Sequence, residues 1–228
     1  IEMLETEQLS PLVDQEALAA FRQRALTPER PVARGMAENP DTFFAHRESC
    51  KPYYESVPEV VEEYMHKISE ITGRRYELFS YYGAEDADRV IVLMGSASEA
   101  AREAIDHLTA QGEKVGLVSV HLYRPFSTKH LLAAVPKTCK RIAVLDRTKE
   151  PGANGEPLYL DVKEAFYGQP DAPQIVGGRY GLGSNDTTPA QILAVYENLA
   201  LPEPKNHFTI GIVDDVTFTS LPKKEEIA

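Results

Sequence analysis

Beyond about residue 76, the sequence alternates short apolar runs with segments of helical periodicity, and this alternation constrains the fold more than any other feature. Apolar runs that continue without polar interruption are typical of parallel strands buried on both faces. Helical segments between such runs form the crossovers of a parallel sheet. We therefore predict an α/β domain with an open, mainly parallel twisted sheet and helices on both faces. The expected strands are 90–94, 115–122, 142–145, 174–176 and 208–213, and the expected helices are 96–112, one starting at Ser127, 157–167 and 189–199.

Charged side chains follow several of these apolar runs directly. Because parallel strands all end at the carboxyl edge of the sheet, we expect these side chains to gather there. They either line a ligand crevice or dock the sheet onto another domain. The candidates are Arg124, Asp146, Arg147, Lys149 and Arg179.

The first third of the chain does not have the pattern of a self-sufficient domain. Asp14 is placed to cap a helix, and a second helix is expected to start at Ser56, with Pro58 in its first turn, and to end at Gly73. The intervening stretch 27–58 shows no sustained periodicity but contains several aromatic residues. Since disordered segments are poor in aromatics, we expect an ordered connector that packs across a neighbouring domain.

Charge and hydropathy exclude two classes of function. The formal net charge is −11, whereas nucleic acids and anionic lipids are bound through Lys and Arg. We therefore expect no nucleic-acid or membrane partner. The apolar runs are only strand-sized, and no signal or transit peptide is visible. The chain begins at Ile1 in a charged stretch, from which we expect a segment of a longer polypeptide.

The cysteine content points to a reducing compartment. Cys50 and Cys139 are the only two cysteines and lie far apart in the sequence. Two isolated thiols are typical of a cytoplasmic protein, and this is the expected location. An iron–sulfur cluster needs about four thiolate ligands, so the chain alone cannot hold one. The histidines are scattered singly, so we expect no metal site.

No motif of known catalytic chemistry is present. The turn MGSASEAA lacks a phosphate-binding glycine pattern, and Ser96 with Glu99 predicts a capping box there. There is no nucleophile elbow and no isolated carboxylate pair. In the loop LDRTKEPGANGEP, opposite charges lie so close together that a structural ion network is favoured over a catalytic dyad. We therefore predict no catalytic residue in this chain.

Longer stretches carry a family resemblance. RPFS, VLDRTKEPG, GEPLYLDV, GGRYGLGS and KNHFTIGIVDDVTFTSLP resemble the pyruvate:ferredoxin (flavodoxin) oxidoreductase family, as do RALTPERPVARGMAENPD and VPEVVEEYMHKISEITGR upstream. The resemblance covers essentially the whole chain. The strand–RPF–helix pattern is also similar to the C-terminal domain of transketolase-type enzymes, which this oxidoreductase family contains.

The resemblance implies a division of the chain into three parts. Residues 1–75 would end the preceding thiamine-binding domain and add a connector helix. Residues 76–205 would be the transketolase C-terminal-like domain, and 206–228 would begin the linker to the next domain.

The resemblance also implies the parent's chemistry. The parent would convert pyruvate to acetyl-CoA, with electron transport to ferredoxin or flavodoxin. It would use thiamine diphosphate, Mg²⁺ and 4Fe–4S clusters, with coenzyme A as a substrate. No cofactor is expected in this segment itself. The expected partners are the other domains of the same polypeptide, a second copy in a homodimer, and ferredoxin or flavodoxin.

Two roles remain open for the segment, and a further alternative concerns the parent. It could be structural, docking onto neighbouring domains and inactive alone, which we favour because phosphate-cradle motifs are absent. Alternatively, the charged sheet edge could form an anion site for coenzyme A. The parent could also be another 2-oxoacid:ferredoxin oxidoreductase with a different substrate.

Overall fold

The computed structural model describes residues 3–33, 35, 37–214 and 216–222 of the chain. The chain divides into two compact units, Ile1–Glu77 and Leu78–Ala228.

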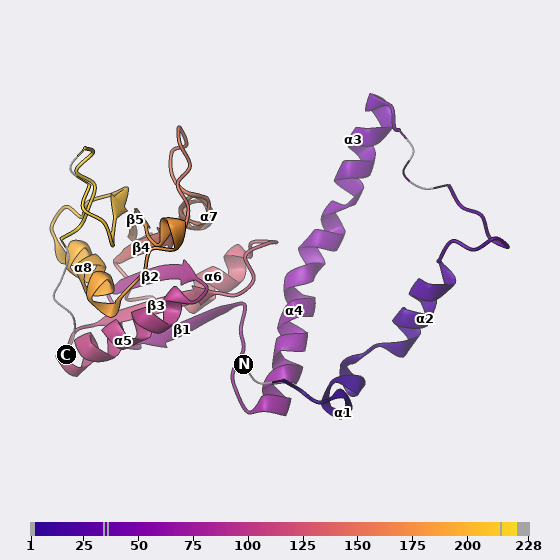
Figure 1. The fold of residues 1–228 in the computed structure, drawn as a ribbon, viewed down its shortest axis with the longest axis horizontal. Helices are drawn as coiled ribbons and strands as arrows, with labels where there is room; N and C mark the ends of the chain where they lie inside the picture. The colour runs from indigo at the N-terminus through magenta and orange to yellow at the C-terminus, as the bar shows by residue number, and fades with distance from the viewer. Residues whose placement is uncertain (1–2, 34, 36, 215, 223–228) are drawn as a thin grey trace. The chain divides into compact units, whose positions relative to one another are not determined.

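The first unit is helical and has almost no buried core. Among its helices, only Pro58 is buried. Several large apolar side chains, among them Phe21, Phe44 and Tyr53, are 67%, 70% and 77% exposed. Its elements are α1 (Thr6–Leu9), the 3₁₀ turn η1 (Ser10–Leu12), α2 (Gln15–Gln23), α3 (Pro40–Ser49) and α4 (Lys51–Thr72) (Figure 1).

The predicted helix boundaries in this unit are partly confirmed. Asp14 caps α2 by accepting the N–H of Ala17 at 2.8 Å, and Gly73 ends α4 in the left-handed conformation with φ of +70°. The predicted start of α4 at Ser56 is wrong, because the helix begins at Lys51. Ser56 lies inside it, with its hydroxyl donating to the carbonyl of Tyr53 at 2.9 Å.

The aperiodic connector contains more helix than the sequence pattern indicated. It includes all of α3 and the first turns of α4. Periodicity marks a helix when one face is buried, and here the aromatic residues stay exposed. The expected packing of this connector against a neighbouring domain stays a prediction.

The second unit is built on a six-stranded sheet with the order β1-β3-β2-β4-β5-β6. Strand β1 runs antiparallel to β3, and all other pairs are parallel. The predicted open, mainly parallel sheet is therefore confirmed. The strands are β1 (Phe79–Gly83), β2 (Arg89–Met94), β3 (Val115–Val120), β4 (Arg141–Asp146), β5 (Gln174–Arg179) and β6 (Phe208–Thr209).

Two strands differ from the prediction. Strand β1 was not expected, because its sequence FSYYG lacks the continuous aliphatic run of a central strand. It lies at the edge of the sheet, where burial is partial. The apolar stretch 208–213 is a strand only at Phe208–Thr209 and then turns away at Gly211, which has a φ of +84°.

Helices cover both faces of the sheet, as predicted. Helices α5 and α8 pack on each other and on β2, while α6 packs on α7, and α7 packs on β4 and β5 (Figure 1). Side chains alternate accordingly: Ile91 and Leu93 of β2 belong to the core cluster that includes residues of α5 and α8. These helices are α5 (Ala97–Ala110), α6 (Thr128–Ala134), α7 (Pro157–Phe166) and α8 (Pro189–Ala200), with a 3₁₀ turn η2 (Leu182–Ser184) before α8.

The predicted capping box at α5 is wrong. Ser96 occupies the N-cap position, but its side chain makes no capping hydrogen bond. Its backbone is already helical, with φ of −64° and ψ of −21°, whereas a capping side chain needs an extended backbone to reach forward. Ser127 likewise precedes α6, and its hydroxyl contacts Nδ1 of His130 at 2.6 Å instead of a backbone amide.

Among the described residues, none of the helices combines the length and the apolar character that crossing a membrane requires.

Candidate functional site

The carboxyl edge of the sheet carries a group of buried charges at the ends of β4 and β5. Asp146 ends β4 and Arg179 ends β5, and the two residues are paired in the register of the strands. At both residues the chain leaves the sheet for the following loop. Asp146 is 3% exposed and Arg179 is 8% exposed, so neither charge is a solvated surface group.

Asp146 stabilises the start of α7. Its Oδ1 accepts the backbone N–H of Leu158 at 2.9 Å and its Oδ2 accepts that of Tyr159 at 3.1 Å. A carboxylate at a helix N-terminus satisfies free amides and interacts favourably with the helix dipole. Burial raises the pKa of Asp146, while the two N–H groups act in the opposite direction. Both oxygens of this candidate residue are therefore used within the fold.

Arg179 and Lys149 meet at a residue that sequence reasoning missed, Glu156. Its Oε1 lies 3.6 Å from Nη1 of Arg179 and 3.4 Å from Nζ of Lys149. Arg179 also donates to the carbonyl of His207 at 2.8 Å. Glu156 is 1% exposed, and its Oε2 has no hydrogen-bond partner among the described residues. One feature of the sequence could have drawn attention to Glu156: it directly precedes Pro157, the first residue of a helix.

Arg147 joins two loops of the same edge. Its Nε donates to the carbonyl of Gly181 at 2.9 Å, which links the loop after β4 to the loop after β5. Gly181 has a φ of +63°, and a Cβ there would lie 3.1 Å from Nε of Arg147. A side chain at position 181 would therefore be strained and crowded.

Arg124 is held apart from this network. It forms an ion pair with Asp161 of α7 at 2.7 Å and stacks on the ring of Tyr123, with 3.9 Å to the centroid. Its side chain is 55% exposed. The structure thus brings three of the five predicted residues together: Glu156 joins Lys149 to Arg179, and Asp146 lies beside Arg179 in the sheet. The other two predicted residues, Arg147 and Arg124, each have a separate partner.

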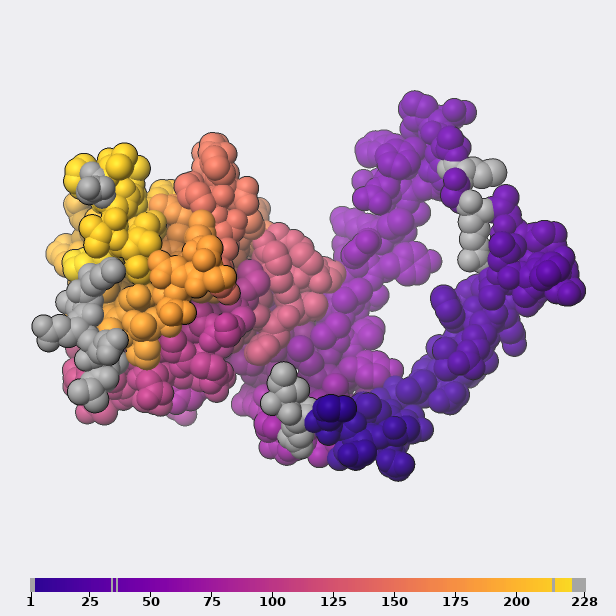
Figure 2. Space-filling model, in the orientation of Figure 1, coloured from indigo at the N-terminus to yellow at the C-terminus, as the bar shows by residue number. Residues whose placement is uncertain are grey.

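Two cavities lie at this edge. One of about 460 Å³ is lined by Glu156, His207 and the loop after β4, and the other of about 300 Å³ by the loop after β5 and the segment after β6. They share the residues Lys149, Arg179, Thr217 and Thr219. Figure 2 shows the loop after β4 in salmon and the segment after β6 in yellow, both projecting from the unit.

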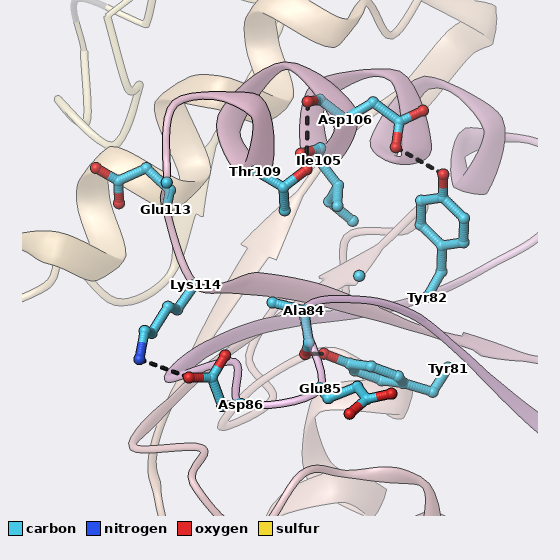
Figure 3. A pocket seen from close by; sticks show the side chains of 12 residues that line it. Tyr81, Tyr82, Ala84, Glu85, Asp86, Ile105, Asp106, Thr109, Glu113 and Lys114 are labelled. Carbon is cyan, nitrogen blue, oxygen red and sulfur yellow. Dashed lines mark hydrogen bonds and ion pairs between the residues drawn. The ribbon is translucent and has the colours of Figure 1, made fainter.

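A larger cavity of about 650 Å³ lies at the other end of the parallel strands, beside β1 and the end of α5 (Figure 3). Its lining includes four carboxylates, of which Asp86 pairs with Lys114 at 2.5 Å and Asp106 accepts the hydroxyl of Tyr82 at 2.6 Å. Glu113 is paired with Arg89. Most of these charges are engaged within the fold, and this cavity contains none of the predicted site residues.

Among the described residues, no recognisable catalytic arrangement lies at either end of the parallel strands. Within the described residues, no group of three or more His, Cys, Asp or Glu side chains is placed to hold a metal ion. The buried thiol of Cys139 has a pKa raised by burial to about 12, so it is a poor nucleophile.

Two family models match the chain. Residues 87–192 match "Pyruvate:ferredoxin oxidoreductase core domain II", and residues 1–66 match "Pyruvate flavodoxin/ferredoxin oxidoreductase, thiamine diP-bdg". The second description assigns thiamine diphosphate binding to the family domain of which residues 1–66 are part.

Curated relatives match over almost the whole chain. A pyruvate-flavodoxin oxidoreductase of Klebsiella pneumoniae is 58% identical over 99% of the chain, and a pyruvate:ferredoxin oxidoreductase of Moorella thermoacetica is 53% identical over 100% of it. The chain spans about a fifth of the length of these relatives, 19% in each case.

A solved structure of 2-oxoglutarate:ferredoxin oxidoreductase from Magnetococcus marinus, with 2-oxoglutarate, coenzyme A and succinyl-CoA bound, resembles the chain weakly. The likeness has a TM-score of 0.41 and 22% identity, and covers 59% of this chain and 21% of that chain. Since the two family descriptions name a pyruvate:ferredoxin and a pyruvate flavodoxin/ferredoxin oxidoreductase, and more than half of the aligned residues are identical in both curated relatives, the chain belongs to the pyruvate:ferredoxin (flavodoxin) oxidoreductase family.

Proposed function

We propose that this chain is part of an enzyme that oxidatively decarboxylates pyruvate to acetyl-CoA and passes the electrons to ferredoxin or flavodoxin. The observation that carries this proposal is the identity of 53–58% to curated relatives of that name, sustained over the whole chain. The acceptor is left as either protein, because relatives with both names match at similar identity. The enzyme would act in the cytoplasm, consistent with two free cysteines.

The cofactors of the proposed enzyme are thiamine diphosphate, Mg²⁺ and 4Fe–4S clusters, with coenzyme A as a substrate. Thiamine diphosphate, when bound, supplies the electron sink for loss of carbon dioxide. The residues of this chain do not fit the clusters, because Cys50 and Cys139 are its only cysteines. The described residues also offer no group of three ligands for a metal ion. The cluster and metal ligands would therefore come from the rest of the polypeptide.

The segment's own role would be structural. It would dock onto other domains of the same polypeptide or onto the second copy in a homodimer. Two features support this role: the first unit leaves large aromatic side chains exposed, and the charges at the carboxyl edge are engaged mainly with the fold itself. Groups that already hold one another in place suit a rigid docking edge better than a catalytic centre.

The activity is tested by comparing two proteins. The full-length parent should reduce a low-potential acceptor when given pyruvate and coenzyme A, and the 228-residue chain should show no turnover. Failure of the full-length protein to oxidise pyruvate would overturn the proposal. Faster turnover of a different 2-oxoacid would assign the parent to another 2-oxoacid:ferredoxin oxidoreductase.

The docking role is tested at Arg147. Arg147→Ala removes the link to the carbonyl of Gly181, so it should impair assembly of the full-length protein, measured by size-exclusion chromatography with light scattering. Coenzyme A affinity should stay unchanged. An assembled Arg147→Ala enzyme that had lost coenzyme A binding would instead favour the anion site.

A coenzyme A site is the second candidate, favoured by the placement of Lys149 and Arg179 in the lining of both edge cavities. Calorimetric titration of the 228-residue chain with coenzyme A separates the two candidates. Binding that is abolished by Lys149→Glu would support the anion site, and absence of binding would leave the docking role.

A further inference from the structure

The fold closes one edge of the six-stranded sheet and leaves the other open. At the β6 edge, the N–H of Thr209 donates to the carbonyl of Thr219 at 3.0 Å, and the N–H of Leu221 donates to the carbonyl of Thr209 at 2.8 Å. The segment after β6 thus covers that edge. Strand β1, at the opposite edge, pairs with β3 alone among the described strands (Figure 1).

Hydrogen bonds at both ends of β1 show which of its residues face β3. Just before the strand, the carbonyl of Leu78 accepts the N–H of the residue that follows β3, at 2.9 Å. Just after it, the N–H of Ala84 donates to the first carbonyl of β3 at 3.0 Å. Every second residue of an antiparallel strand is bonded to its neighbour, so Ser80 and Tyr82, which are in phase with these two residues, face β3.

The other three residues of β1, Phe79, Tyr81 and Gly83, direct their N–H and C=O groups to the open side. Among the described residues of the second unit, no hydrogen bond reaches these groups. A row of unpaired N–H and C=O groups is a template to which another strand can add.

The large side chains of β1 pack back over the sheet, so they do not cover this outer backbone. The ring of Tyr81 lies over Gly116 of β3, where a Cβ would collide with it. Tyr82 donates its hydroxyl to Asp106 of α5 at 2.6 Å (Figure 3). Phe79 is buried and meets an aromatic ring before α6 edge-on, with 5.5 Å between the ring centroids.

The strand also lacks the features that keep edge strands unpaired. Natural edges are protected by charged residues, Pro, bulges or very short strands. The sequence of β1 is FSYYG, which has five residues, no Pro and no charge. Since strands of this length are common in stable sheets, β1 is long enough to pair.

An antiparallel copy of β1 satisfies all of the open groups. With a two-fold axis at Tyr81, this residue pairs with its counterpart, and Phe79 pairs with Gly83 of the second copy. Each outward N–H then meets a C=O, because residues that face each other in this way exchange both hydrogen bonds. The same patch serves both copies, as a two-fold interface requires, and no like charges oppose each other along the strands.

The charges of α5 suit the same two-fold axis. Helix α5 connects β2 to the parallel β3, so it runs opposite to both and in the direction of β1. Arg102 lies over the ring of Tyr82, 5.0 Å from its centroid, and Asp106 follows one turn later. Arg102 is therefore nearer to the Phe79 end and Asp106 nearer to the Gly83 end. The axis reverses this order in the second copy, which brings opposite charges together across the paired strands.

We propose that the open edge of β1 binds a second copy of this chain, with the two β1 strands antiparallel about an axis at Tyr81. The two sheets then continue into one another across the paired strands. This inference rests on the homodimer included in the docking role proposed above, and it names the surface through which the two copies meet.

The test is sedimentation equilibrium of the 228-residue chain at increasing concentration. Stable interfaces bury about 1,200–2,000 Å², and a five-residue strand pair is small, so we expect a weak dimer that forms as the concentration rises. Amide hydrogen exchange by nuclear magnetic resonance locates the contact. The amides of Phe79, Tyr81 and Gly83 should become protected on dimerisation, whereas Ser80 and Tyr82 are bonded to β3 already and should change little.

Two substitutions in β1 should weaken the dimer for different reasons. Tyr81→Pro removes the N–H at the axis but no hydrogen bond to β3, so it should abolish dimerisation. Ser80→Lys adds the kind of residue that protects natural edges, and it should raise the dissociation constant about tenfold. Gln174→Lys is the charge-matched control, because it changes an exposed residue of β5 and should leave the dissociation constant unchanged. Circular dichroism checks that each variant is folded.

Several results would overturn the proposal. A chain that stays monomeric at every concentration would leave the edge to another segment of the parent polypeptide. Dimers that resist both β1 substitutions, or that protect only amides of the first unit, would place the interface elsewhere. Assemblies larger than a dimer would also contradict it, since a two-fold pair uses the open edge of both copies. Pyruvate oxidation by the full-length parent is measured separately, so the proposed activity and this interface can fail independently.

Discussion

Arg179 and Glu156 form an ion pair whose two members are almost completely buried, with Nη1 and Oε1 3.6 Å apart. Arg179 lies at the end of β5, and Glu156 lies directly before α7. The pair therefore ties the sheet to the loop that returns from β4, and both of its members line the edge cavity of about 460 Å³.

Breaking this pair should destabilise the second unit. Glu156→Ala leaves the Arg179 guanidinium buried without its carboxylate, so we expect the free energy of unfolding to fall by about 3 kcal/mol. Urea unfolding followed by circular dichroism measures this change. The double variant Glu156→Leu with Arg179→Met should recover a large part of the loss, since an apolar pair replaces two charges. A single variant as stable as the wild type would show that the pair contributes nothing.

Gly178 should resist substitution because the sheet leaves no room for a side chain. A Cβ at this position would lie 2.3 Å from Cε2 of Phe208 and 2.8 Å from Cδ2 of Leu145. Gly178→Ala should therefore lower the free energy of unfolding by about 2 kcal/mol through overpacking. Gly177→Ala is the matched control, because its nearest contact is 3.1 Å, to Tyr159. Thermal unfolding should show the larger decrease for Gly178→Ala.

The strands that were predicted correctly are those buried on both faces. In β2 the residues 90–93 are all buried, and such a run is visible in the sequence because no polar residue interrupts it. Strand β1 was not predicted, because an edge strand buries less of its surface than a central one. The tyrosines of β1 are also compatible with a loop. Helix α3 was not predicted either, because it buries no residue and its sequence therefore shows no apolar face at helical spacing.

The candidate site was predictable only where charges follow strands. Asp146 and Arg179 end neighbouring strands, and a parallel sheet necessarily brings them to one edge. Glu156 reaches this edge only through the turns of loop 147–156, which no local pattern specifies. Arg124 also follows a strand, but it pairs with Asp161 of α7. This ion pair depends on how α7 packs, which the sequence pattern does not specify.

Arg141 should stabilise the end of α8. Its guanidinium donates to the carbonyls of Leu199 and Leu201, at the C-terminus of that helix, where carbonyls lack intrahelical donors. Arg141→Met should lower the free energy of unfolding by about 1–2 kcal/mol, because charged donors at such carbonyls are lost. Lys140→Met, at an exposed neighbouring position, should change urea unfolding little. Equal effects of the two substitutions would contradict this role.

The two cysteines should differ in reactivity towards iodoacetamide. Burial raises the pKa of the Cys139 thiol to about 12, so almost no thiolate exists near neutral pH, and the side chain is buried. Cys50 is half-buried. We expect Cys139 to react about a hundredfold more slowly than Cys50 in the folded chain, and equally fast in urea. Mass spectrometry of the labelled peptides gives both rates, and similar rates in the folded chain would contradict the burial of Cys139.

Asp146 should give stability a dependence on pH opposite to that of an ordinary salt-bridged carboxylate. Burial raises its pKa in the folded state above the ordinary value of 3.8, so the folded chain binds more protons than the unfolded chain between these two values. Its contribution to the free energy of unfolding is then fully present below pH 3.8 and is lost as the pH rises through the raised pKa.

Asp146→Asn removes the titration, and it also removes one acceptor of the N–H groups of α7 at every pH. The stability difference between the wild type and Asp146→Asn, measured by urea unfolding from about pH 4 to about pH 7, should therefore decrease with rising pH. A difference that increases over this range would mean that the two N–H groups outweigh burial and that the pKa of Asp146 is lowered.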